Sequence, residues 1–250
     1  MIKESRRARR RKGTKKIKGR CQCMRTCTLR PLKNLPFCKK HTFCPRKAPL
    51  SGYEPEFNPD IYNNHEGLKD AQNCFAYAFD YRKLPKGCTA SKCPASFPQP
   101  GSASGYPSWG EINGKRCPDL LARLFGDVKG IKMSSFEERC PKHYSKIAAV
   151  IDEDEDYHFY RQDKNGYWSH KPGSTNVTRL DGTGRPIYDP RLASRYYSES
   201  GLNYDEFCSY LCVPKNTNIH FKRGGKRSIK RNKTKKRKKS YVPISNLFKP

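Results

Sequence analysis

Residues 157–173 read YHFYRQDKNGYWSHKPG, and the rest of the chain can be arranged around them. Its two aromatic-rich runs flank Asn165-Gly166, a dipeptide favoured in tight hairpin turns, so the stretch predicts two antiparallel strands. His158 begins the first strand and His170 ends the second. Because hairpin pairing brings these ends together, we expect the two imidazoles to lie close, held rigidly by their strands.

Upstream of the hairpin, the run QNCFAYAF predicts a helix over residues 74–82 with Asn73 as its capping residue. A cysteine in the first turn of a helix has its thiolate stabilised by the helix dipole, and a nearby imidazole lowers its pKa further. Cys74, His158 and His170 are therefore candidates for a nucleophile, a base and an orienting group. The alternative is that Cys74 is a small buried apolar residue, which is the commoner role of cysteine in apolar segments.

This arrangement resembles the Cys-His-His pattern of NlpC-type papain-like cysteine peptidases. The runs DYHFYR and WSHKPG are also similar to proteins of bacteria and of giant DNA viruses, and the likeness covers residues 46–214. By analogy, the resemblance implies that Cys74 is the nucleophile, His158 the general base and His170 its orienting residue. The backbone amide of Cys74 would hold an oxyanion, helped by Gln72. The chain departs from the bacterial enzymes at Asn73, where they usually have Asp.

The other segments predict an α+β domain with a mixed, mainly antiparallel sheet. Residues 117–126 read CPDLLARLFG and predict a capped amphipathic helix closed by glycine. Strands are expected over residues 147–151 and 205–214, with a weaker one over 128–133. The remaining expectations are an extended lead-in over 45–70, a long loop over 86–110, and a solvated acidic loop over 152–156.

The cysteines between residues 21 and 45 have the spacing of a small zinc module. The set Cys23, Cys27, Cys38 and His41 matches a Cys3His knuckle, in which a structural Zn²⁺ supplies the folding energy that a core would otherwise provide. Cys21 and Cys44 are surplus, so the ligand set stays open.

The chain has twelve cysteines in all. Without an export signal, that number predicts metal ligands and free thiols more than disulfides, although disulfides formed after assembly into a particle remain an alternative. Cys208 and Cys212 are four residues apart on one expected strand, which predicts that they share a face and pack in the core. A further alternative is a second metal site built from Cys88, Cys93, Cys117, Cys140 and His143.

The net charge of +29 is concentrated at the two ends of the sequence. Residues 1–20 hold eleven Lys or Arg and one Glu, and residues 215–250 hold fourteen Lys or Arg and no acidic residue. Such segments bury too little apolar surface to fold alone, so we expect disorder. We expect residues 1–20 and 215–240 to bind nucleic acid or another polyanion, with a nuclear address or a solubilising tail as the alternative.

The last apolar segment, residues 241–248, is expected to anchor the chain to a capsid or other virion protein. The first twenty residues lack the apolar stretch of a secretory signal, and no run approaches the roughly 18 apolar residues that span a bilayer. These observations predict no membrane span and a location in a virion or in the host cytoplasm or nucleus.

The sequence thus predicts four parts: a basic arm (1–20), a zinc knuckle (21–45), a papain-like domain (46–214) and a basic tail with an apolar anchor (215–250). The leading functional hypothesis is thiol hydrolysis of an amide by a peptidase or amidase of a large DNA virus. One alternative is a non-enzymatic virion protein, in the capsid or on the genome, that uses the fold as a scaffold. Another is a nucleic-acid-binding protein that acts through the zinc module and the tails.

Overall fold

The computed structural model of the chain describes residues 47–89, 91, 93, 97–112, 115–153 and 155–215, all within the compact unit Lys47–Pro250. Its centre is a five-stranded sheet in the order β1–β7–β2–β3–β4, with every neighbouring pair antiparallel. The strands are β1 (Lys132–Ser134), β2 (Tyr144–Asp152), β3 (Asp156–Gln162), β4 (Trp168–Ser169) and β7 (Glu206–Pro214), and a separate ribbon pairs β5 (Tyr196–Tyr197) with β6 (Leu202–Asn203). An α+β fold with a mainly antiparallel sheet is confirmed.

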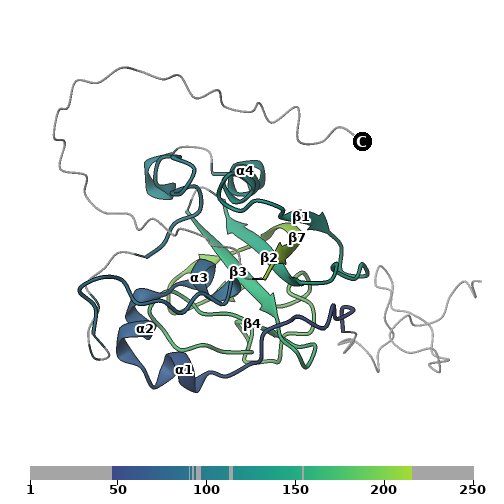
Figure 1. Ribbon diagram of the computed structural model, residues 1–250, viewed down its shortest axis with the longest axis horizontal. Helices are drawn as coiled ribbons and strands as arrows, with labels where there is room; N and C mark the ends of the chain where they lie inside the picture. The colour runs from purple at the N-terminus through teal and green to yellow at the C-terminus, as the bar shows by residue number, and fades with distance from the viewer. Residues whose placement is uncertain are drawn as a thin grey trace, which may run out of the picture. The chain divides into compact units, whose positions relative to one another are not determined.

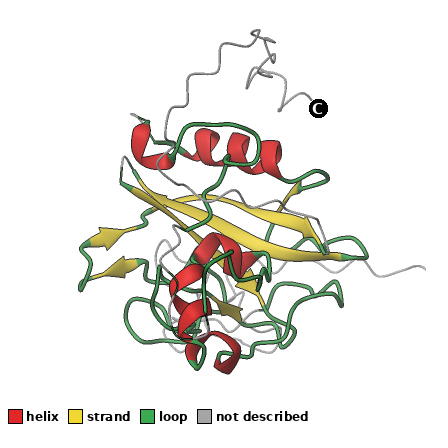
Figure 2. Ribbon diagram, turned by 60° about the vertical axis from the view of Figure 1, so that its left-hand side comes forward, coloured by secondary structure: helices red, strands yellow, loops and turns green. Residues whose placement is uncertain are grey.

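The helices are short, apart from the eleven residues of α4 (Cys117–Asp127). Figure 2 shows α4 lying across one side of the long strands, while α1 (Asp60–Asn63) and α2 (Glu66–Ala71) lie on the other side, near β4 (Figure 1). The remaining helices are α3 (Cys74–Ala78) and the 3₁₀ turn η2 (Trp109–Glu111). The extended lead-in predicted over residues 45–70 therefore contains two short helices.

Both faces of the sheet are covered, so β2 is buried along almost its whole length. Alternate side chains of a strand point to opposite faces. On one face, Ile147 and Ala149 pack with Leu120 and Leu124 of α4 in what we call the helix-side cluster. On the other face, the loop-side cluster joins Ala148, Val150, Tyr160, Trp168 and Tyr210 to Ile187 and Tyr204 from the long segment after β4.

Helix α3 is shorter than the sequence predicts. It begins at Cys74 under the expected cap, since the Asn73 side chain accepts a hydrogen bond from the amide of Ala76 at 3.2 Å. It ends at Ala78 instead of residue 82, because Asp80 adopts the left-handed backbone conformation, with φ of 53°. The β3–β4 hairpin is present, but its second strand pairs at only two positions.

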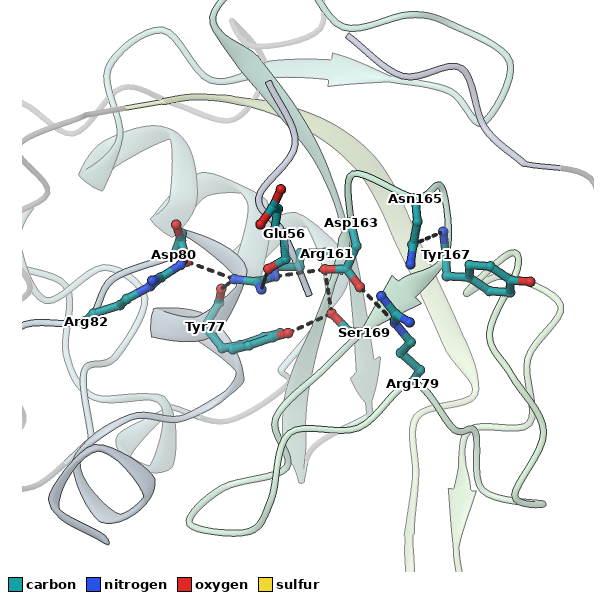
Figure 3. Close-up of polar contacts among 10 residues, drawn as sticks. All are labelled: Glu56, Tyr77, Asp80, Arg82, Arg161, Asp163, Asn165, Tyr167, Ser169 and Arg179. Carbon is teal, nitrogen blue, oxygen red and sulfur yellow. Dashed lines mark hydrogen bonds and ion pairs between the residues drawn. The ribbon is translucent and has the colours of Figure 1, made fainter. Parts of the chain in front are cut away.

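A buried ionic network fixes α3 against the hairpin (Figure 3). The Arg161 guanidinium, only 1 % exposed, donates to Asp163 at 3.2 Å, to Asp80 at 3.1 Å and to the carbonyl of Tyr77 at 3.2 Å. Ser169 of β4 bridges the Tyr77 hydroxyl and the Asp163 carboxylate, at 2.7 Å and 2.9 Å. Burial raises the pKa of Asp163, and the charge of Arg161 offsets part of this rise. The network positions the helix that carries Cys74 relative to the strand that carries His158.

Six of the described cysteines form disulfides, so the prediction of metal ligands and free thiols is wrong for them. The bonds join Cys88 to Cys93, Cys117 to Cys208 and Cys140 to Cys212. The last two connect residues 91 and 72 positions apart, with Cα atoms 5.0 Å and 5.5 Å from each other. Spacing along the chain could not reveal these pairs, because only the folded sheet brings them together. The hypothetical second metal site built on these cysteines is excluded.

The predicted zinc ligands Cys23, Cys27, Cys38 and His41 lie outside the described residues, as do the basic arm and the tail beyond residue 215. In the part of the chain that the structure describes, no cluster of three or more His, Cys, Asp or Glu side chains could hold a metal ion. Over the same residues, no helix combines the length and apolar character that crossing a bilayer requires.

Candidate functional site

A cleft of about 750 Å³ opens beside β3. The short strand β4 pairs with β3 only at Arg161 and Gln162, so the first half of β3 lies at an edge of the described sheet. Asn73 and Cys74 line the cleft from the start of α3, and Tyr157 and His158 line it from β3. Its other walls are formed by Phe97, Gln99, Trp109, Gly110, Glu155, Asp156, Pro172, Gly173, Ser174, Thr175, Tyr197, Glu199, Ser200, Leu202 and Tyr204.

The structure brings the two predicted histidines together. Nε2 of His158 lies 2.8 Å from Nδ1 of His170, and Nε2 of His170 lies 2.9 Å from the carbonyl oxygen of Leu180. A carbonyl only accepts, so Nε2 of His170 carries a proton and, in the neutral ring, its Nδ1 accepts from His158. Both rings are buried, which lowers the pKa of His158 well below its usual value and that of His170 to about 4. The pair is therefore neutral at pH 7.

Cys74 does not have the environment of an activated thiol. Its side chain is 5 % exposed, and its sulfur lies 3.9 Å from the carbonyl oxygen of Tyr157. Burial raises the pKa of the thiol, and the carboxylate of Asp156 raises it further. The lowered pKa expected from a helix dipole and an imidazole is therefore not found. A five-residue helix offers little dipole, and burial disfavours the thiolate.

The pleat of β3 separates the cysteine from the histidines. Tyr157 and Phe159 pack in the helix-side cluster together with Cys74. His158 lies between them in the strand, so its ring points to the opposite face, where it contacts Tyr204 and His170 at centroid distances of 5.1 Å and 5.0 Å. Among the described residues, no hydrogen bond joins the Cys74 sulfur to either imidazole. Cys74 and His158 thus line one cleft from opposite faces of β3.

Gln72 does not line the cleft. Its side chain is fully buried, and Nε2 donates to the carbonyl oxygen of Lys83 at 2.9 Å. The side-chain amide of Gln72 thus holds the segment that returns after α3, a role that no sequence motif indicated.

The cleft has an acidic and aromatic character that the sequence motifs did not predict. Glu155, Asp156 and Glu199 line it, and the chain's many lysines and arginines contribute nothing to its described wall. Asp156 accepts a hydrogen bond from the Tyr204 hydroxyl at 2.8 Å, and burial raises the pKa of its carboxyl. The acidic run 152–156 was visible in the sequence, but the segment 197–204 that faces it carries no motif and is placed there only by the fold.

Comparison with known proteins changes the family and the function assigned to the chain. No known family profile matches the chain, and no solved structure matches it. It is 34 % identical over 157 residues to insoluble matrix shell protein 1 of Ruditapes philippinarum, a match that covers 63 % of this chain and 88 % of that protein.

This relationship overturns the resemblance to NlpC-type peptidases and the hydrolase function inferred from it. It also overturns the alternative of a virion component and the expected location in a virion, cytoplasm or nucleus. The relationship assigns no role to individual residues, so the catalytic roles expected for Cys74, His158, His170 and Gln72 stay predictions. The chain belongs to the family of insoluble matrix shell protein 1.

Proposed function

We propose that this chain is a secreted structural protein of a shell's organic matrix, with no catalytic task. The observation that carries the proposal is the 34 % identity to insoluble matrix shell protein 1, extending over 88 % of that protein. A match of this extent includes most of the relative's fold, so it is more informative about function than three residues separated along the chain.

The disulfides support an extracellular location. Disulfides persist in oxidising compartments and are rare in the cytosol. Cys117–Cys208 and Cys140–Cys212 both end on β7, a central strand, and so hold the domain together through its middle. A protein that remains folded in a mineral matrix, where no cellular machinery refolds it, gains from such bonds.

The basic ends provide a means of attachment to the matrix. Residues 1–20 and 215–250 carry most of the net charge of +29, and dense positive charge attracts acidic polymers of any backbone, nucleic acid included. In a matrix the polymers of this class are acidic proteins and acidic polysaccharides. We propose that the ends bind these polyanions while the disulfide-bonded domain provides a rigid body between them.

The location is tested by raising an antibody against residues 47–215 and probing fractions of the source organism's shell. Dissolving the mineral with a chelator should leave the protein in the insoluble organic residue, and reduction should be needed to unfold it fully. Finding it only in soluble extracts of the soft tissue would refute a matrix role.

The polyanion proposal is tested with the full chain and polyaspartate. Binding should weaken steeply as salt rises from 50 to 200 mM (roughly tenfold or more), because each neutralised charge releases a counterion. A variant with the lysines and arginines of residues 222–239 changed to glutamine should bind more weakly and with a shallower salt dependence. A variant with the same number of exposed lysines and arginines changed within residues 47–215 is the control. Equal binding by the two variants would refute attachment through the tail.

A further inference from the structure

We propose that Asn176 carries an N-linked glycan, an inference that rests on the proposed secretion of the protein. Asn176-Val177-Thr178 has the Asn-x-Thr pattern that the N-glycosylation machinery recognises in exported chains. The pattern means nothing in a cytosolic protein. It becomes an acceptor site once the chain enters the secretory pathway.

The folded structure leaves room for a glycan at this asparagine. Asn176 is exposed, and its side-chain amide has no hydrogen-bond partner among the described residues. It follows a tight turn closed by the Thr175 amide, which donates to the carbonyl oxygen of Pro172 at 2.9 Å. A bulky polar substituent would therefore project into solvent without displacing any existing contact.

The residues on either side hold Asn176 outward. Val177 is 5 % exposed and packs with Tyr62, Leu68 and Tyr77. Its amide donates to the side-chain oxygen of Asn63 at 2.7 Å, and the Asn63 amide group donates back to its carbonyl at 3.4 Å. The amide and the carbonyl of Val177 are both bound to Asn63, and its side chain is buried. Asn176, the preceding residue, is therefore kept at the surface.

Thr178, the third member of the pattern, is also in a defined position. Its backbone exchanges two hydrogen bonds of 2.9 Å with His170, and its hydroxyl accepts from the amide of Leu180 at 3.1 Å. The modification occurs during export, before these bonds form, so the fold has only to accommodate its product. The covalent step forms a bond between the Asn176 amide nitrogen and the first sugar carbon of a lipid-diphosphate-linked oligosaccharide. The lipid diphosphate leaves, and the amide nitrogen loses one proton.

The glycan would stand beside the mouth of the cleft. Ser174 and Thr175, the two residues before Asn176, line the cleft that also contains Cys74 and His158. A hydrated oligosaccharide there adds a polar surface that the protein presents to the matrix, independent of the charged ends. It also places a bulky group at the entrance of the cleft.

The test uses the full chain behind a foreign secretion signal in cultured mammalian cells, so that export does not depend on the native route. Asn232-Lys233-Thr234 is a second Asn-x-Thr triplet in the sequence, and Asn232→Gln removes it. In this background, the secreted protein should carry one glycan that a peptide N-glycosidase removes. Adding Asn176→Gln or Thr178→Ala should abolish the loss of mass that the glycosidase causes. Thr178→Ser keeps the hydroxyl and the acceptor pattern, so it should retain that loss of mass.

A secreted Asn232→Gln protein with its disulfides formed but without any glycan would overturn the inference, whatever the fate of the matrix proposal. The protein extracted from shell provides a second readout. Enzymatic release in heavy-oxygen water should label Asn176 in the tryptic peptide 165–179, and fragmentation must place the label there and not on Asn165. Finding the protein in the matrix with Asn176 unmodified also refutes the glycan. Finding Asn176 glycosylated on the recombinant chain while the native protein is absent from shell refutes the matrix role alone.

Discussion

Cys208 and Cys212 lie four residues apart on β7, yet their side chains point to opposite faces of the sheet. Leu211 and Val213 pack in the helix-side cluster, so Cys212 between them points to the other face, where it bonds to Cys140. Cys208 packs against the helix-side cluster and bonds to Cys117 at the start of α4.

A β-bulge causes this reversal. Ala149 of β2 pairs with Ser209, whereas the next residue, Val150, pairs with Phe207. Cys208 is the extra residue, and an extra residue shifts which side chains face each side of the sheet. The prediction that the two cysteines share a face is therefore wrong, and β7 is cross-linked on both faces.

The two long-range disulfides should account for a large share of the protein's stability. Replacing Cys117 and Cys208 with serine opens a loop of 91 residues and should lower the free energy of unfolding by about 4–5 kcal/mol in the chain-entropy account. Replacing Cys88 and Cys93, which are 5 residues apart, should cost about 2 kcal/mol and is the matched control. Urea unfolding of both double variants measures the difference. Equal losses would show that loop length is not what makes the longer bond stabilising.

Arg161 should be the most sensitive residue of the buried network. Arg161→Met leaves the buried Asp163 carboxylate without its nearest cation and should destabilise the domain by about 3–5 kcal/mol. Arg82 pairs with Asp80 at 2.7 Å but is 39 % exposed, so Arg82→Met should cost less than about 1 kcal/mol. Thermal or urea unfolding at pH 7 compares the two. A small loss of stability in Arg161→Met would mean that the cost of burying the guanidinium charge offsets the favourable energy of its ion pairs.

The histidine pair should make the domain sensitive to mild acid. Burial holds the pKa of His170 near 4 against an unfolded value near 6.5, so the unfolded chain binds the proton first. The contribution of His170 to the free energy of unfolding is therefore fully present above about pH 6.5. It falls by up to about 3 kcal/mol as the pH drops toward 4. His170→Gln should flatten that part of the stability profile. The prediction fails if wild type and variant lose stability in parallel between pH 6.5 and 4.5.

Lys171 should make the stability of the domain depend on pH in the alkaline range. Its ammonium is fully buried and donates to the carbonyls of Lys69 and Gly173 at 2.6 Å and 2.8 Å, and burial lowers its pKa to about 7. Between pH 7 and about 10.5 the unfolded chain holds more protons, so the contribution of Lys171 to stability rises with pH. Lys171→Met should therefore compare more favourably with wild type at pH 6 than at pH 9.5. A difference that does not change with pH would place the pKa of Lys171 near its ordinary value.

Cys74 should react slowly in the folded protein. Burial raises the pKa of its thiol, so little thiolate exists at pH 7, and the sulfur is shielded from solvent. Alkylation with iodoacetamide, followed by peptide mapping, should label Cys74 far more slowly in the native protein than in urea. Rapid native labelling of Cys74 at pH 6 would instead show an activated thiol and reopen a chemical role for the cleft.

The local elements and the distribution of charge follow from the amino-acid sequence alone. Asn165-Gly166 and its aromatic flanks specified the β3–β4 hairpin, Asn73 capped α3, and the pattern of residues 117–126 specified α4. These features depend on backbone preference and on short-range periodicity, which are legible within about ten residues.

Which distant groups meet depends on the folded chain. Sheet register determines which face of β3 carries His158, and the bulge in β7 turns Cys208 toward α4. Long-range packing brings residues 197–204 to the cleft. A shift of one residue in register exchanges the faces of a strand, so motif spacing alone cannot determine contact. Cys74, His158 and His170 were predicted to converge, and the fold joins the two histidines while the pleat of β3 keeps the cysteine on the other side.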